Sequence, residues 1–210
     1  NQNTYIWSGS SISIADNLDA LNLNPAGLGF NRGEQQALIF KNLEGDNNFI
    51  GLTSRFKSGF AYELYYDNSS YNYSIGYGSQ LMNNFYSGFK LNKKRDYSLG
   101  LLYRPFDFLS ISSVIYDNHR NADYKLSRYS FAIKPFEINK LLSNKNSYLK
   151  KSNFSFGYDK TTNEIDQKIQ EQYFLSLTIT PGIDFSYFAY DDNYGFNLSF
   201  NLGKEGAQIN

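Results

Sequence analysis

From Gln35 onward, apolar and polar residues alternate along this chain in short runs. The run from Asn193 to Leu202 shows the pattern most simply, because Tyr, Phe and Leu take every second position while Gly, Asn and Ser fill the positions between. Successive side chains of a β-strand point to opposite faces of a sheet. This run therefore predicts a strand with one apolar face and one face of small polar residues.

Runs of this kind recur with turn residues between them, and together they predict 12 strands. The predicted strands cover residues 35–43, 48–56, 59–67, 71–78, 85–92, 97–104, 108–116, 125–134, 153–159, 171–180, 183–190 and 193–202. Many are close to the roughly 9 to 11 residues that a tilted strand needs to cross a membrane. An even number of strands also brings both ends of the chain to one side of a barrel. The predicted fold class is all-β and antiparallel.

The polar faces distinguish two architectures for such strands. The solvated face of a soluble sandwich usually carries Lys, Glu, Arg and Thr, whereas these faces carry Ser, Gly, Asn and Ala with isolated charges. Small polar residues suit the confined interior of a closed antiparallel transmembrane β-barrel, whose apolar face meets lipid. The isolated charges predicted to face the lumen are Glu63, Lys90, Arg104, Arg128 and Asp184.

Residues 1–33 lack this alternation. Asp16 to Leu21 predicts a short helical turn capped by Asp16. The turn should end at the motif Asn24, Pro25, Ala26, Gly27 and Leu28, because Pro blocks a helix and Gly permits a turn. The predicted organisation is an N-terminal hatch or plug at residues 1–33, a β-barrel at residues 34–203, and a polar tail or linker at residues 204–210.

Composition narrows the possible functions. The chain holds 19 Tyr and 18 Phe, and Tyr suits a membrane interface, where one end of the side chain is apolar and the other is wet. Its 20 basic and 20 acidic residues cancel, which disfavours a nucleic-acid partner. Without Cys, and with His119 as the single histidine, a disulfide framework, a His-based triad and a multi-His metal site within one chain are excluded. We expect no enzyme activity, no cofactor and no metal.

The motif Asn24 to Leu28, preceded by the Asp16 turn and followed by the first strand, resembles the Asn-Pro-Ala signature of the fatty-acid-transporter superfamily of outer-membrane barrels. That superfamily includes the shuttle barrel of type IX secretion. The resemblance implies a hatch folded into the lumen and an antiparallel barrel around it. This chain departs from the family in its length, because the fatty-acid transporters usually have 14 strands.

Two further stretches resemble smaller relatives of that superfamily. Tyr97 to Pro105 and Phe131 to Phe136 look like their units of strand, Arg/Lys-Pro turn and strand, and some of these barrels precede a signal-peptide-peptidase-like domain. The last strand, with Gly195, Leu198 and Phe200, is similar to the signal that barrel-assembly machinery reads.

The leading hypothesis is a porin-like β-barrel of the Gram-negative bacterial outer membrane. It would act as a membrane anchor or scaffold, or as a narrow conduit that transports small or hydrophobic compounds. Its expected partners are outer-membrane lipid, barrel-assembly machinery and other outer-membrane or periplasmic subunits. Two alternatives stay open: a barrel module of a membrane-bound peptidase or secretion complex, and a soluble β-sandwich that binds carbohydrate through exposed Tyr.

Overall fold

The computed structural model describes residues 11–42, 48–67, 70–93, 96–117, 125–135, 154–165, 167, 169–180, 183–190 and 193–200. Within these residues the chain forms 12 strands and two short helices. The strands are β1 (Gln35–Asn42), β2 (Asn48–Arg55), β3 (Phe60–Asp67), β4 (Ser70–Met82), β5 (Phe85–Asn92), β6 (Tyr97–Phe106), β7 (Leu109–Asp117), β8 (Lys125–Ile133), β9 (Phe154–Asn163), β10 (Ile169–Thr180), β11 (Ile183–Tyr190) and β12 (Asn193–Phe200). The helices are α1 (Ala20–Leu23) and the 3₁₀ helix η2 (Pro25–Gly29).

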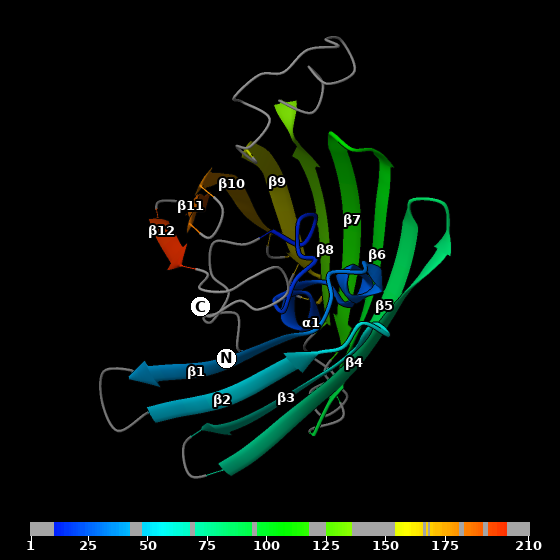
Figure 1. The fold of residues 1–210 in the computed structure, drawn as a ribbon. Coiled ribbons are helices and arrows are strands. Elements are labelled where there is room, and N and C mark those ends of the chain that lie inside the picture. The colour runs from blue at the N-terminus through cyan, green and yellow to red at the C-terminus, as the bar shows by residue number, and fades with distance from the viewer. Residues whose placement is uncertain are drawn as a thin grey trace.

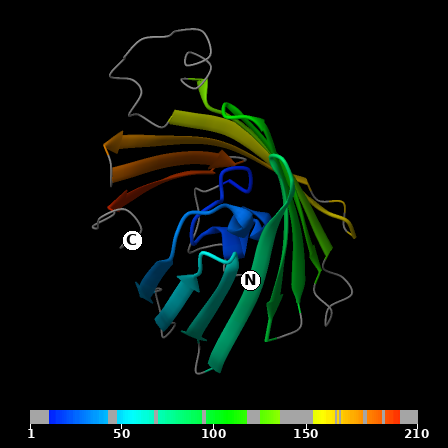
Figure 2. The same cartoon turned by 45° about the vertical axis from the view of Figure 1, so that its right-hand side comes forward.

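All 12 strands belong to one antiparallel sheet in which each strand pairs with its neighbours in the sequence. The predictions of an all-β fold, of the strand number and of antiparallel pairing are therefore confirmed. The sheet curves until its first and last strands lie on opposite sides of a concave space (Figures 1 and 2). Within the described residues β1 and β12 are unpaired edges, so the sheet is open at that seam. The sandwich alternative requires two sheets, and the described strands form one.

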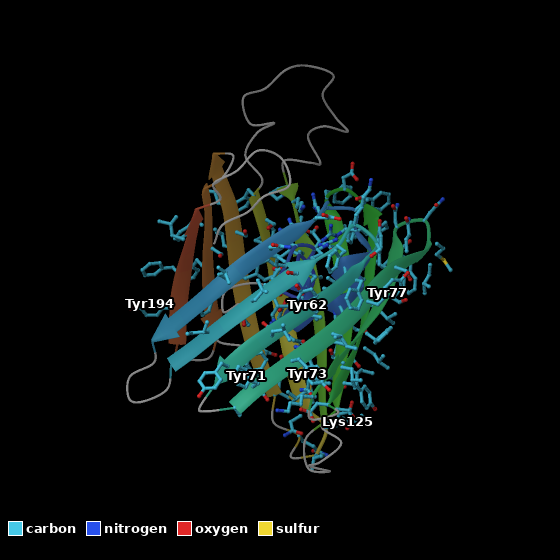
Figure 3. The ribbon with its side chains drawn as sticks, turned by 60° about the horizontal axis from the view of Figure 1, so that its bottom comes forward. Tyr62, Tyr71, Tyr73, Tyr77, Lys125 and Tyr194 are labelled. Atoms are coloured by element: carbon cyan, nitrogen blue, oxygen red, sulfur yellow. The ribbon has the colours of Figure 1, made fainter. Side chains whose placement is uncertain are left out.

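The alternation read from the sequence separates an outer face from an inner face. In β4, Tyr71, Tyr73, Ile75 and Tyr77 are exposed, while Ser74, Gly76 and Gly78 are buried. Tyr194 of β12 is 76% exposed, as is Tyr71 of β4, although the two strands lie far apart in the sheet order. Figure 3 shows Tyr71, Tyr73 and Tyr194 on the outer surface. The apolar rows thus point outward, and they contact one another only sideways between neighbouring strands, as Tyr77 and Phe89 do, rather than across the concave space.

Residues 11–30, named here the inner segment, lie on the concave side of the sheet (Figure 2). Most of its apolar residues are buried, and six of them form two clusters with residues of the strands. One cluster joins Ile12, Ala15 and Leu23 to Val114 of β7, and the other joins Ala20, Leu21 and Leu28 to Ala61 of β3. The inner segment therefore supplies much of the apolar core that the small inner-face residues of the strands cannot build alone.

The helix predicted in this segment starts later than expected. It begins at Ala20, and Asp16 does not cap it because the Asp16 carboxylate is paired with two arginines instead. Asn24 ends α1, and its side-chain oxygen accepts a hydrogen bond from the Ala26 N–H at 3.1 Å. Pro25 then opens η2, where a missing N–H costs nothing.

The boundary expected at Gly78 is also wrong. Strand β4 continues to Met82, and Gly78 pairs with Gly88 of β5 rather than opening a turn. Gly88 in turn pairs with Gly100 of β6, so three glycines lie side by side across three strands. We name these residues, Gly78, Gly88 and Gly100, the glycine track.

The glycine track is where the inner segment approaches the sheet most closely. A Cβ at Gly78 or Gly88 would overlap the carbonyl oxygen of Pro25, and a Cβ at Gly100 would overlap the side-chain oxygen of Asn24. Backbone therefore packs on backbone at Gly78 and Gly88, and the Asn24 side chain packs on the backbone of Gly100, which only glycine allows. The glycines that resemble turn signals in the sequence serve as the seat for the Asn24 to Leu28 motif.

Gly88→Ala should push the inner segment off the sheet, because the added methyl group meets backbone atoms that have no rotamer to escape into. We expect a loss of about 1–3 kcal/mol in the free energy of unfolding, measured by urea titration of the refolded protein. Ser87→Thr adds one carbon to the residue that precedes Gly88 in β5 and is the matched control. It should change the free energy of unfolding by less than about 0.5 kcal/mol. Equal stability of the two variants would contradict the close-packing role of the track.

Candidate functional site

The inner segment is fixed to the sheet by a buried ion-pair cluster around Asp16. The Asp16 carboxylate oxygen Oδ2 lies 2.7 Å from a guanidinium nitrogen of Arg104 in β6 and 2.7 Å from one of Arg32. Asp16 and Arg104 are largely buried, whereas the Arg32 side chain is 46% exposed. The Arg104 guanidinium also lies over the Phe30 ring, 4.2 Å from its centroid. Charge and cation–π contacts thus hold this part of the inner segment in one place.

A third arginine, Arg55 of β2, binds the same segment through its backbone. Arg55 is 1% exposed and donates to four carbonyl oxygens, those of Asp16, Asn17, Leu28 and Phe30. One side chain therefore joins the start and the end of the segment. The prediction from the sequence omits Arg55, although it alternates with Gly51 and Thr53 as an isolated charge on a small polar face.

A second polar cluster holds the beginning of the inner segment. Ser11 Oγ donates to Asp159 of β9 at 2.5 Å, and Asp159 pairs with Arg128 of β8 at 2.6 Å. Ser13 and Ser130 complete the cluster through hydrogen bonds between their hydroxyl groups. Asp159 accepts hydrogen bonds from Arg128, Ser11 and Ser130, so its carboxylate joins β8, β9 and the inner segment. The cluster is therefore best explained as an attachment point.

The third attachment passes through Asn22. The Asn22 side chain donates to Glu63 of β3 at 3.1 Å and accepts a hydrogen bond from Lys90 of β5. Glu63 is 0% exposed, so the amide lies between a buried carboxylate and an ammonium group and satisfies one atom of each. This arrangement resembles a bridged ion pair inside the concave space.

The five charges predicted to face inward are placed as follows. Glu63, Lys90 and Arg104 lie on the inner face and contact the inner segment directly, and Arg128 reaches it through Asp159. Asp184 pairs through its backbone with Thr178 and Ser199, and its side chain lies outside the described part of the chain. The sequence identified these charges but not their common partner.

The Asn24 to Leu28 motif is anchored by Asn24. Its side-chain nitrogen donates to the carbonyl oxygens of Ile12 at 3.0 Å and Leu101 at 3.3 Å, which ties two parts of the segment to β6. Gly27 leaves no space for a Cβ against Ala15, and Leu28 fills one of the apolar clusters. Asn24, Gly27 and Leu28 thus each have a local structural reason, whichever family the motif resembles.

The proposed assembly signal is described only in part. Gly195 packs beside the Phe188 ring, and Leu198 is 46% exposed on the outer face. Phe200 pairs with Ile183 through its backbone, and its side chain is outside the described part. Recognition by assembly machinery stays a prediction. His119 and Trp7 also lie outside the described residues.

The two carboxyl groups of the inner segment titrate in opposite directions. Burial acts to raise the pKa of Asp16, but the positive charges of Arg104 and Arg32 outweigh it and lower the pKa to about 2. Burial raises the pKa of Asp19 to about 7, and the negative charge of Asp16 adds to this effect. Asp16 is therefore ionised at every physiological pH, whereas Asp19 changes its charge near neutrality.

A pocket opens beside the Asp16 cluster, at the end of the sheet where the β4–β5 and β6–β7 turns lie. Its volume is about 390 Å³, and its lining includes turn residues Asn84 and Asp107. The side chains that give it its character are Phe30, Arg32, Tyr86, Arg104, Phe108 and Lys134. The sequence offered no signal for this pocket, because its lining comes from strand ends and turns far apart in the chain.

Comparison with known protein families, curated proteins and solved structures gives no match for this sequence. Among the described residues, no helix has the length and apolar character required to cross a membrane. The same residues contain no group of three or more His, Asp or Glu side chains arranged to hold a metal ion.

The inner segment should be most strongly protected from hydrogen exchange near pH 4. An unfolded Asp titrates near 3.9, so the roughly 2 kcal/mol contributed by Asp16 is complete above about pH 4 and is lost as the pH falls toward 2. Asp19 behaves oppositely, because its ionisation penalises the folded state increasingly from about pH 4 to 7. Amide exchange of residues 20–29, corrected for intrinsic rates, measures both effects.

Two variants separate the contributions to this profile. Asp19→Asn should remove the loss of protection between pH 4 and 7, and Asp16→Asn should speed exchange at pH 7 at least tenfold by leaving two arginines unpaired. Flat protection between pH 3 and 8 in the unmodified protein would show that these carboxyl groups do not hold the segment.

Proposed function

We propose that this chain is a β-barrel of the bacterial outer membrane, with residues 11–30 as a plug inside its lumen. The observation that supports the proposal most strongly is the inversion of the two faces. Large apolar side chains are exposed on the outer face, while serine, glycine and charged residues are buried on the inner face. A soluble protein arranges its faces in the opposite way.

The extent of the outer apolar surface argues for lipid as its surroundings. Among the described residues, 30 large hydrophobic side chains are exposed, and every strand of the sheet contributes at least one of them. Monomers in water rarely expose apolar patches larger than a few hundred Å². Contact with hydrocarbon removes the cost of exposing such a surface to water.

The order of residues along the outer row of β6 supports lipid as the surroundings. On β6 the exposed row is Tyr97, Leu99, Leu101 and Tyr103. Tyrosines at both ends with leucines between them match a bilayer, whose interfaces favour aromatic hydroxyl groups and whose core favours aliphatic chains. A surface that binds carbohydrate has no reason to show this order.

In a membrane the open seam must close. Unpaired N–H and C=O groups along β1 and β12 would cost several kcal/mol each in hydrocarbon. With 12 antiparallel strands, β1 and β12 run in opposite directions, as a closing antiparallel pair requires. We therefore propose that β12 pairs with β1 in the bilayer.

The proposed barrel is closed to passage while the plug is seated. Arg55, Asn24 and the Asp16 cluster attach the plug to β2 and β6, so a conduit opens only when these contacts break. A second candidate function follows from the same attachments: the firmly plugged barrel acts as a membrane anchor or scaffold. A peptidase or secretion partner for such an anchor is a further proposal that rests on sequence resemblance alone.

Depth-dependent substitutions test the membrane assignment. Phe89 lies near the middle of β5 and is 47% exposed, whereas Met82 lies at the end of β4 and is 66% exposed. Phe89→Arg should destabilise the protein folded in phospholipid vesicles by about 2–4 kcal/mol, and Met82→Arg should destabilise it by about 0–1 kcal/mol. In a soluble protein both exposed positions accept arginine equally, and the chain dissolves without detergent.

Cysteine cross-linking tests closure, because the chain has no cysteine of its own. A cysteine at Leu38 of β1 is combined in turn with one at Phe196, Asn197, Leu198 or Ser199 of β12. In a closed barrel at least one combination forms a disulfide within one chain, since paired strands bring Cα atoms within about 4.4–6.8 Å. If disulfides form only between two chains, β1 pairs with β12 of a second copy, and the proposed closure within one chain is wrong.

Planar-bilayer recordings distinguish the conduit from the anchor. Asp16→Asn removes the charge that pairs with Arg32 and Arg104, so a conduit should open more often by at least tenfold. Asp117→Asn changes an exposed carboxylate that bonds Tyr97 and is the matched control. Unchanged conductance in Asp16→Asn, with its faster hydrogen exchange verified, would leave the anchor as the function.

A further inference from the structure

The pocket beside Asp16 has the composition of a site for an organic anion. Arg32, Arg104 and Lys134 supply three positive charges to its lining, and Asp107 supplies one negative charge. Guanidinium groups recognise carboxylates and phosphates through paired hydrogen bonds, and an ammonium group adds a point charge. The lining thus favours an anion over a neutral or cationic ligand.

Three aromatic side chains, Phe30, Tyr86 and Phe108, also line the pocket, together with Asn84, Leu109, Ser110 and Ala132. Phe30 stacks on Tyr86 with ring centroids 4.0 Å apart, and Phe108 is parallel to Phe106 at 5.1 Å. The Phe30 ring is covered by Tyr86 and by the Arg104 guanidinium, so it holds that guanidinium in place, while the aromatic part of the lining suits a ligand with an aromatic or short apolar part next to its charge. The volume of about 390 Å³ lies within the range of small-molecule sites.

The cations of the pocket are also the cations that hold the plug. Arg32 and Arg104 are both 2.7 Å from the same oxygen of Asp16, so they have a carboxylate partner already. A ligand carboxylate that enters the pocket competes with Asp16 for these two guanidinium groups. Linkage is reciprocal, so weakening of the Asp16 contact by the ligand implies tighter ligand binding when Asp16 is removed.

From the three cations, the aromatic side chains and the shared contact with Asp16, we propose that this pocket binds amphipathic organic anions, such as aromatic carboxylates, and that binding loosens the inner segment. The pocket exists whether or not the sheet closes, so binding does not depend on the membrane assignment. The step from a loosened segment to an opened conduit rests on the proposed function.

The test uses the refolded full chain in detergent micelles and isothermal titration with benzoate and 1-naphthoate. We expect saturable binding that weakens with added NaCl, and no saturable binding of benzyl alcohol, the neutral analogue. Lys134→Gln should weaken benzoate binding about fivefold. Lys125→Gln removes the same charge at the other end of β8, where Lys125 pairs with Glu164, and should leave the affinity within about twofold.

Two further readouts examine the coupling. Asp16→Asn should bind benzoate several-fold more tightly, because Arg32 and Arg104 no longer have a competing carboxylate. Saturating benzoate should speed amide exchange of residues 20–29 in the unmodified protein and leave the exchange of β9 unchanged. Equal affinity in the Lys134→Gln and Lys125→Gln proteins, or equal binding of benzyl alcohol, would overturn the site. Binding without any change in exchange would overturn the coupling.

These results are distinguishable from failure of the proposed function. A chain that folds into vesicles with the expected cost of Phe89→Arg but does not bind benzoate retains the membrane assignment and loses the site. A chain that binds benzoate with the expected variant pattern but stays soluble without detergent retains the site and loses the barrel.

Discussion

The fold depends on contact between two backbones. The Asn24 to Leu28 motif lies directly on Gly78, Gly88 and Gly100: its backbone meets the first two glycines, and the Asn24 side chain meets the third. The Arg55 carbonyl contacts and the Asp16 ion pairs attach the same segment to β2 and β6. A curved sheet of small inner residues would otherwise enclose a space that its own side chains cannot fill.

Electrostatics inside the concave space follows a consistent rule. Each buried charge on the strands has a partner on the inner segment or a partner that contacts it, as Arg104 has Asp16 and Glu63 has Asn22. Such pairs offset their desolvation only when the geometry is maintained. The charges therefore stabilise one seating of the segment more than they stabilise the fold in general, and they penalise any shifted position.

The sequence predicts the strands well because a period of two is a strong signal when one face is apolar and the other small. Rows such as Tyr71, Tyr73 and Ile75 appear in the structure as expected. Glycine was harder to interpret, because a glycine such as Gly78 is expected both in turns and at positions in a strand where another backbone approaches closely. The end of β4 was misplaced for that reason.

Partners distant in the sequence were beyond prediction. Asp159 and Ser11 are 148 positions apart in the sequence, and nothing in the sequence around either residue indicates that they form a hydrogen bond. The pocket has the same origin, because Phe30, Tyr86 and Lys134 come together only after the sheet curves. Isolated charges on a small polar face, including Arg55, are the one signal that could have located the site.

The sequential strand order has a consequence for how the molecule is made. Successive strands can be added one after another, but the inner segment, which precedes them all, touches strands from β2 to β9. In the proposed barrel the strands must assemble around an inner segment that is already in place. Inserting this polar, folded segment after the barrel had closed would require it to pass through the completed wall. Pairing of the first and last strands is then the final step of assembly, and it encloses the inner segment.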